Sequence, residues 1–145
     1  MEIDYKLLMD TAKEAAKKSY SPFSKFAVGA GVLTSSGKVY GGCNIENSSF
    51  GMTICAERCA IFKAVSDGEK EILAVAIYSP NEDDCYPCGA CRQVMYEFQG
   101  EREIEIITEE KGELNIKKMS DFLPFGFKIQ EQMLLHQLFY LYHSS

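Results

Sequence analysis

The spacing of apolar residues along this chain alternates between that of a helix and that of a strand. Amphipathic helical patterns alternate with short apolar or β-branched runs that are typical of strands, and Gly, Pro and Ser mark several of the boundaries. The expected elements are helices at 4–18, 55–65 and 88–98, a hairpin at 27–40, and strands at 72–78 and 103–108. Because helices alternate with strands, the chain fits a layered α/β architecture in which helices flank one sheet.

The length suits a single domain. With 145 residues, the chain can bury one core but not two independent ones, and no repeat or linker divides it. We therefore expect one domain at 1–128. The segment 129–145 differs because it is strongly apolar, and we expect a helical tail that packs on the domain or on another subunit.

The charge and hydropathy pattern excludes several classes of partner. A net charge of -6 gives no basic surface for a nucleic acid polymer. No apolar stretch reaches the roughly 18 residues that a membrane span needs, and the first residues lack the features of a signal peptide. The expectation is a cytoplasmic protein that binds neither a nucleic acid polymer nor a membrane.

Two cysteine motifs point to metal chemistry, since clustered cysteines in a reducing compartment bind metals or carry out redox reactions. They are CAER at 55–58 and PCGAC at 87–91, and each opens an expected helix. Cys88 and Cys91 are three residues apart and share a helix face, and a helix N-terminus favours the thiolate. Cys55 would complete a three-sulfur set, which leaves the fourth tetrahedral position of zinc open, as in catalytic sites. The sequence predicts one Zn²⁺ per chain.

Two neighbours of Cys55 suit a reaction at such a site. Zinc lowers the pKa of bound water from about 15.7 to about 7 and so supplies hydroxide at neutral pH. Three thiolates weaken this effect, and Arg58 together with the helix N-termini would offset part of their charge. Glu57 is poorly spaced to be a further ligand, so we expect it to carry protons from water to the substrate ring and to the leaving amine.

The motifs resemble the signature of the cytidine deaminases, in the variant with three cysteine ligands and a glutamate that does not bind the metal. The similarity also covers YSPFSKF at 20–26, GCNIEN at 42–47 and LPFGF at 123–127. It implies a three-layer α-β-α fold with a mixed five-stranded sheet, and a homotetramer. It further implies hydrolytic deamination of cytidine and deoxycytidine to uridine and deoxyuridine, with release of ammonia, in pyrimidine salvage.

The same resemblance implies the substrate contacts. Asn44 and Glu46 would bind the ribose hydroxyl, and Phe26 would stack near the base. Ala56 would also contact the substrate, and Phe127 would reach into the site of a neighbouring subunit.

The sequence departs from the family pattern at two positions and at its end. Phe50 stands where a tyrosine is common, which removes a hydroxyl that could contact the sugar of a neighbouring site. Cys59 stands where a threonine is common, and the tail after Lys128 is longer than the resemblance accounts for.

Other interpretations of these residues remain open at this point. The CxxC pair could be redox-active, and Cys43, Cys59 or Cys85 could supply a fourth ligand to a purely structural zinc. Glu57 could be no more than a favourable charge at a helix start, and Arg58 an ordinary surface cation.

The substrate contacts and the activity also have alternatives. Asn44 and Glu46 could belong to an ordinary polar loop, and Phe26 and Phe127 to the core. As alternative functions, the chain could deaminate another small aminopyrimidine nucleoside, such as a nucleoside antibiotic, or be a noncatalytic zinc-binding module.

Overall fold

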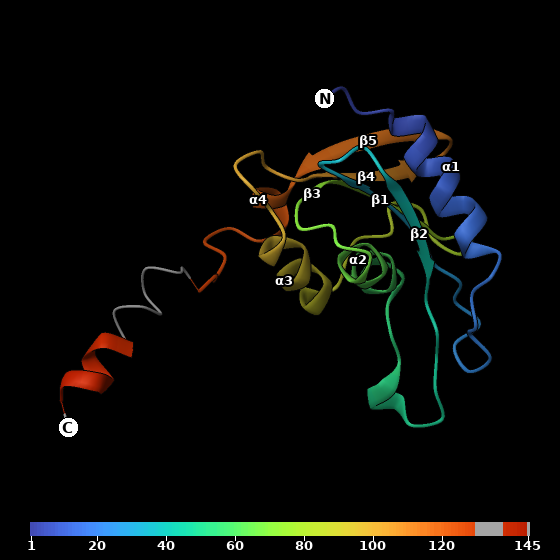
Figure 1. The fold of residues 1–145 in the computed structure, drawn as a ribbon. Helices are drawn as coiled ribbons and strands as arrows, with labels where there is room; N and C mark the ends of the chain where they lie inside the picture. Colours follow the sequence, from blue (N-terminus) through green and yellow to red (C-terminus); the bar gives the residue numbers. More distant parts are fainter. Residues whose placement is uncertain (130–137, 145) are drawn as a thin grey trace.

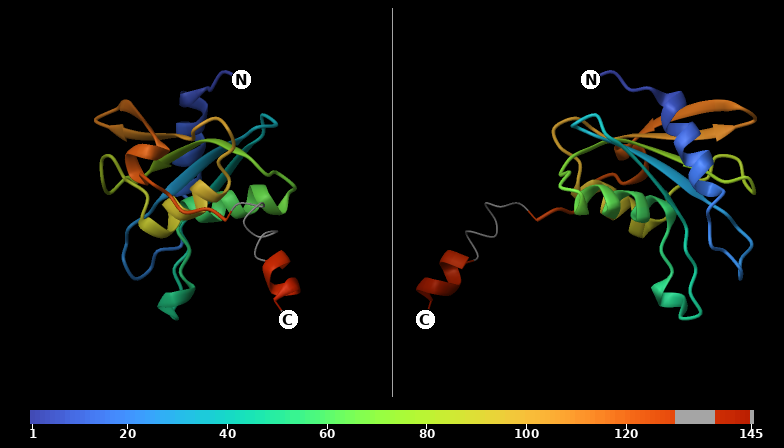
Figure 2. Two further views of the ribbon diagram at one scale, coloured as in Figure 1. Left: turned by 90° about the vertical axis from the view of Figure 1, so that its left-hand side faces the viewer. Right: turned by 45° about the vertical axis from the view of Figure 1, so that its right-hand side comes forward.

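The fold is a mixed five-stranded sheet with helices on both faces. The computed structural model describes residues 1–129 and 138–144. The elements are α1 (Tyr5–Ala16), β1 (Gly29–Thr34), β2 (Val39–Cys43), the 3-10 turn η1 (Phe50–Met52), α2 (Ala56–Ser66), β3 (Ile72–Tyr78), α3 (Gly89–Glu97), β4 (Glu105–Glu110), β5 (Glu113–Lys118) and α4 (Met119–Phe122). Helix α1 covers one face of the sheet, and α2 and α3 cover the other (Figures 1 and 2). The expected α-β-α layering is confirmed.

The strand order is β2-β1-β3-β4-β5, and the starts of α2 and α3 lie at the same end of the strands, beyond the carboxyl end of the central strand β3. β1 is antiparallel to β2 and β3, β3 is parallel to β4, and β4 is antiparallel to β5. Parallel neighbours need a crossover connection, and α3 supplies it between β3 and β4. Helix α3 therefore starts beyond the carboxyl end of β3, and α2, which leads into the beginning of β3, starts near the same end.

Two apolar layers hold the helices to the sheet, because successive side chains of a strand point to opposite faces. Val32 of β1 and Ile106 of β4 are buried in the layer beneath α2 and α3. Their neighbours Leu33 and Ile107 are buried in the layer beneath α1. The period of two in each strand thus gives the sheet two buried faces.

The sequence-based elements agree with the structure except that the second strand of the expected hairpin runs on to Cys43, η1 was not expected, and two elements near the end of the domain were missed. The helix expected at 4–18 is α1, whose start is capped by the Asp4 carboxylate, which accepts a hydrogen bond of 3.0 Å from the Leu7 amide. Strand β5 and the single turn of α4 were not among the elements expected from spacing. The turn before β5 has Lys111 at φ 50° and Gly112 at φ 82°, so a lysine occupies a backbone conformation that usually signals Gly or Asn.

A close approach between β2 and α2 fixes the position of the helix that begins beside Cys55. A Cβ atom on Gly42 would lie 2.5 Å from the Ala60 amide nitrogen and 2.9 Å from the Ala56 carbonyl oxygen. Both contacts are with backbone atoms, which cannot rotate away. Only glycine therefore allows strand and helix to pack this closely.

We expect Gly42→Ala to lower the free energy of unfolding by at least about 1–3 kcal/mol, because overpacking against backbone forces the helix away from the sheet. Chemical denaturation measures this effect. Gly51→Ala is the matched control, since a Cβ atom there meets nothing within 4 Å. Equal stability of the two variants would contradict the prediction.

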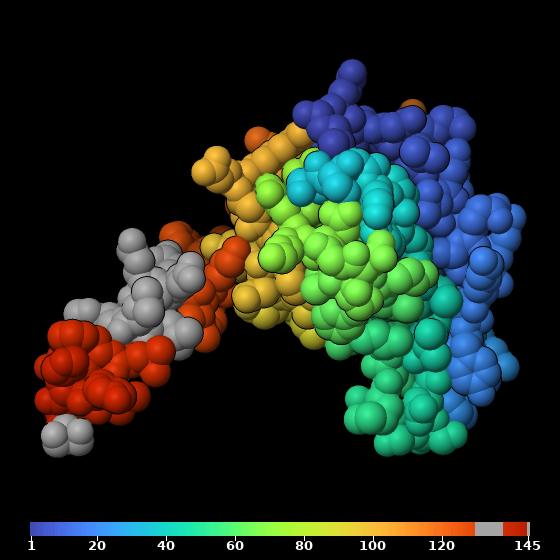
Figure 3. Space-filling model, viewed as in Figure 1, coloured from blue at the N-terminus to red at the C-terminus, as the bar shows by residue number. Residues whose placement is uncertain are grey.

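The expected C-terminal tail is described only in part, because residues 130–137 lie outside the described ranges. Residues 138–143 form a short helix, drawn in red in Figure 3. Its apolar side chains are exposed, including Leu141 at 73% and Tyr142 at 85%. Packing of the tail on the domain or on another subunit stays a prediction. Neither this helix nor any within 1–129 is long and apolar enough to cross a membrane.

Candidate metal centre and active site

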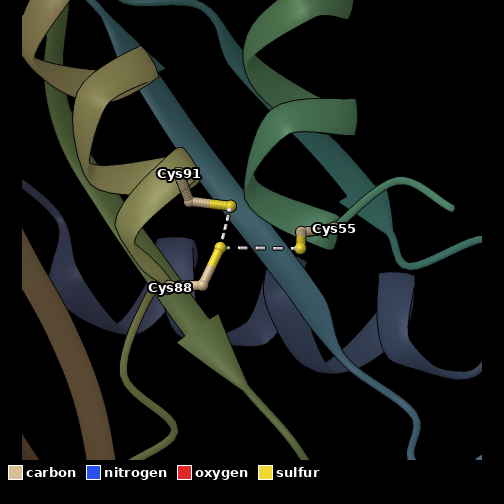
Figure 4. A group of neighbouring side chains, drawn as sticks. All are labelled: Cys55, Cys88 and Cys91. Atoms are coloured by element: carbon tan, nitrogen blue, oxygen red, sulfur yellow. Dashed lines mark hydrogen bonds between the residues drawn. The ribbon is translucent and has the colours of Figure 1, made fainter. Parts of the chain in front are cut away.

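Three cysteine sulfurs from two helix starts converge on one point. Cys55 is the N-cap of α2, Cys88 is the N-cap of α3, and Cys91 lies in the first turn of α3. The Sγ atom of Cys88 lies 3.9 Å from that of Cys55 and 3.5 Å from that of Cys91 (Figure 4). All three sulfurs lie within 4.8 Å of one another.

The local backbone explains how two helix starts present sulfur to one centre. Cys55 (φ -76°, ψ 154°) and Cys88 (φ -70°, ψ 170°) are extended, as N-cap residues commonly are. Each carbonyl accepts the first bond of its helix, from the Cys59 amide at 3.0 Å and the Arg92 amide at 2.9 Å. Neither thiol makes a capping bond to its own helix. The sulfurs are therefore available for a ligand.

The spacing of the sulfurs fits a tetrahedral zinc ion. Cysteine sulfurs bind zinc at about 2.3 Å, which places two sulfurs of a tetrahedral site about 3.8 Å apart. Within the described residues, Cys43, Cys59 and Cys85 do not belong to the cluster. Burial raises the pKa of Cys85 to about 12, so this side chain remains a thiol. The described cysteines could therefore supply three ligands to a metal ion and no fourth.

Arg58 stabilises negative charge on the cluster. Its Nη2 donates to Cys55 Sγ at 3.3 Å, and this bond raises the pKa of the guanidinium. A hydrogen bond from Cys91, assisted by Arg58, lowers the pKa of the Cys55 thiol. The bond to Cys55, together with burial, raises the pKa of Cys91. One thiolate is therefore already favoured before a metal binds, and Arg58 is not an ordinary surface cation.

Glu57 is the one buried acid beside the cluster, in the part of the chain that the structure describes. It is only 4% exposed and lies in the first turn of α2. Burial raises its pKa, and the negative charge of Cys55 adds to the shift. A raised pKa makes a carboxyl group a better proton acceptor, as a general acid–base group needs. This environment differs from that of an exposed charge at a helix start.

Asn44 ties the segment after β2 to the loop before β1. Its Oδ1 accepts hydrogen bonds from the Val28 amide at 2.9 Å and from the Ser19 hydroxyl, and its Nδ2 donates to the Phe26 carbonyl at 2.7 Å. A free polar loop would not show this set of bonds. Asn44 thus fixes the backbone on both sides of Ala27.

Glu46 fixes an earlier part of the same loop. Its Oε1 accepts from the amides of Phe23 at 2.9 Å and Ser24 at 3.1 Å. The hydrogen bonds with Ser24, from its side chain and its amide, lower the pKa of Glu46, which therefore stays charged. Sequence spacing did not predict that Asn44 and Glu46 organise the 19–28 loop.

The other predicted contact residues divide into buried and exposed ones. Ala56 is fully buried at the start of α2, and the partly buried Phe26 packs on the core that includes Cys91. Phe127 is 66% exposed and is not part of that core. Asn81 was not singled out from the sequence, yet its Oδ1 accepts from the Ala27 amide at 3.1 Å and anchors the same loop. An asparagine in a turn carries no signal for such a long-range contact.

Comparison with known proteins decides the family. The family model described as the cytidine and deoxycytidylate deaminase zinc-binding region matches residues 2–107, which include all three cysteines of the cluster. The chain belongs to this deaminase family. It is thus a zinc-dependent hydrolase of the cytidine deaminase type, as the motifs predicted.

Close relatives of this cytidine deaminase family member match over most of its length. The cytidine deaminase of Sporosarcina psychrophila is 43% identical over 129 residues, covering 89% of this chain and 95% of the relative. That of Mycobacterium tuberculosis is 37% identical over 131 residues, covering 90% and 94%. The crystal structure of the Burkholderia pseudomallei cytidine deaminase has a TM-score of 0.79 at 39% identity, covering 86% of this chain and all of that one. The structural similarity therefore agrees with the family that the sequence comparison shows.

Proposed function

We propose that this protein hydrolyses cytidine and deoxycytidine to uridine and deoxyuridine, with release of ammonia, in pyrimidine salvage. The observation that carries the proposal is the meeting of three sulfurs from two helix starts beside the buried Glu57, in a chain of the cytidine deaminase family. We assign one zinc ion per chain to Cys55, Cys88 and Cys91. Zinc bound there would supply hydroxide near neutral pH.

The protein's own groups account for the proton transfers. Glu57 accepts a proton from the attacking water and gives it to the ring nitrogen next to C4. As the C4–N bond breaks, Glu57 takes the remaining proton of the hydroxyl group on C4 and delivers it to the departing amine, which leaves as ammonia. One water is consumed, and a carbonyl replaces the amino group. Burial of Glu57 supports this role because it raises the pKa of the carboxyl group and so strengthens it as a proton acceptor.

The loop that Asn44 and Glu46 organise is the proposed sugar site. We assign the ribose hydroxyl to these two side chains, the base to Phe26, and a further substrate contact to Ala56. The hydrogen bonds of Asn44 and Glu46 to the 19–28 backbone support the proposal, because they preorganise both groups beside the same loop.

We expect the enzyme to deaminate free nucleosides and to reject their phosphates. The Arg58 guanidinium is engaged with Cys55, and Glu46 adds negative charge at the proposed sugar site, so neither favours a phosphate. The kcat/KM for cytidine 5′-monophosphate should be lower than that for cytidine by roughly 100-fold, about 2.7 kcal/mol. Ultraviolet assays of both substrates, with deoxycytidine alongside, measure this ratio. Comparable turnover of cytidine and its monophosphate would show the assignment to be wrong.

We further expect a homotetramer in which Phe127 completes a neighbouring site. Large apolar side chains are exposed on the η1 projection, which stands out from the body in Figure 3, and on the segment after α4. They include Phe50 at 77% and Phe127 at 66%. Exposed apolar groups of this kind are typical of subunit contacts. Light scattering should give four times the mass of one chain, whereas a fully active monomer would refute this part of the proposal.

A further inference from the structure

Arg92 links the turn that carries Cys88 to the C-terminal segment of the domain. Its Nε donates to the Pro87 carbonyl oxygen at 2.8 Å, and its Nη1 donates to the Phe122 carbonyl oxygen at 3.0 Å. Pro87 directly precedes Cys88, so the first bond restrains the peptide that leads into this cluster sulfur. The second bond reaches 30 residues along the chain.

Ring contacts reinforce this link. The guanidinium carbon of Arg92 lies 5.2 Å from the centroid of the Phe122 ring, within the range of a cation–π contact. The Tyr86 ring, from the turn before Cys88, lies 5.5 Å from the same Phe122 ring. Polar and aromatic contacts therefore join the same two segments.

Helix α3 also holds the far end of the C-terminal segment. Gln93 Nε2 donates to the Phe127 carbonyl oxygen at 2.9 Å. A Cβ atom on Gly126 would lie 2.9 Å from the Tyr96 ring, so the chain passes directly against the helix there. The segment 122–127 is thus attached to α3 at both ends.

We propose that Arg92 is a positioning residue that acts through Pro87 and Phe122. It holds Cys88 in place for a metal ion, and with Gln93 it holds the segment that presents Phe127. The statement about Cys88 requires only that the three sulfurs bind a metal. The statement about Phe127 rests on the proposed function.

Arginine suits this role because its planar guanidinium offers several donors in a fixed fork. A lysine at this position has one ammonium on a flexible stem and cannot reproduce both carbonyl bonds with the ring contact. Arg92→Met keeps much of the apolar stem and removes every donor. Arg92→Lys should therefore weaken the contacts between the two segments in part, and Arg92→Met should remove both hydrogen bonds.

Zinc release from the full-length protein tests the role of Arg92 without an activity assay. We expect Arg92→Met to lose zinc to an excess of chelator at least about tenfold faster than the wild type, with Arg92→Lys between them. In the cobalt-substituted protein, the thiolate-to-metal absorption band of Arg92→Met should weaken. Arg102 provides matched controls, because its Nη1 also donates to a backbone carbonyl, that of Met1 at 2.7 Å, beyond the opposite end of α3.

The outcomes separate the inference from the proposed function. If Arg92→Met folds and retains the wild-type release rate and cobalt spectrum, the inference is wrong. If Arg92→Met does not fold, Arg92→Lys decides, and release no faster than from Arg102→Lys overturns the inference. If zinc release behaves as expected but the wild type does not deaminate cytidine, Arg92 keeps its role and the proposed function fails.

A second variant tests the hold on Phe127. Gln93→Leu removes the bond to the Phe127 carbonyl while leaving Arg92 in place. We expect zinc release as in the wild type, and a KM for cytidine raised by about 2- to 10-fold, a larger effect than that on kcat. An unchanged KM would remove Gln93 from the inference.

Discussion

Glu57→Gln should retain one zinc per chain and lose about 10²- to 10⁴-fold in kcat, the range expected when a general acid–base group is removed. The amide is close in size and shape to the carboxyl group, so the packing at this buried position is preserved. It cannot accept the proton of the attacking water. Steady-state deamination of cytidine, with metal content determined on the same sample, measures the effect.

The matched control is Glu14→Gln, which changes the same side chain on the exposed face of α1, where it pairs with Lys17. We expect wild-type kcat for that variant, because surface pairs contribute little. Unchanged turnover in Glu57→Gln would remove Glu57 from the mechanism. Loss of zinc from Glu57→Gln would instead show that the carboxyl group supports the metal.

Cys91→Ser should reduce the zinc content from one ion per chain to near zero and abolish deamination. Cys91 is fully buried and lies 3.5 Å from Cys88, so no other described cysteine can replace its sulfur. A serine hydroxyl is a much weaker zinc ligand than a thiolate, and two sulfurs do not hold the ion. Atomic absorption and the cytidine assay measure the two losses.

Cys59→Ser is the matched control, since Cys59 lies on α2 near Cys55 but outside the cluster. We expect it to bind one zinc and to turn over cytidine like the wild type. Full zinc content in Cys91→Ser, or loss of zinc in Cys59→Ser, would assign the ligands differently. Removal of zinc from the wild type by a chelator should likewise abolish activity, and added zinc should restore it.

Spacing in the sequence was sufficient to predict the elements that build the core. The strand expected at 72–78 is β3, because a continuous apolar run between turn signals marks a strand buried on both faces. β5 was harder to find because it is a polar edge strand, and Lys111 conceals the turn before it. α4 is a single turn, too short for any helical period to be visible.

In the site, contacts between residues close in sequence could be predicted, and contacts between distant residues could not. Cys88 and Cys91 could be placed together because they lie three residues apart at one helix start, whereas Cys55 was added as the third ligand of a catalytic zinc, as the family resemblance also implied. The hydrogen bonds that join Asn44 with Phe26 and with Val28 span 18 and 16 residues, and the bond that joins Arg92 with Phe122 spans 30. Such contacts depend on the path that each loop takes in the folded chain. The spacing of residue types along the sequence does not predict this path.

The two helix starts that share the cluster are far apart along the chain, since Cys55 and Cys88 are separated by 33 residues. An ion bound to both closes a covalent ring through α2, β3 and the start of α3, in the manner of a disulfide. A ring of this size removes many conformations from the denatured chain, and this effect grows only slowly with ring size. We therefore expect the segment from α2 through α3 to unfold as one unit when the protein holds its metal ion. The metal-free chain can fray at the first turn of either helix while the sheet stays intact.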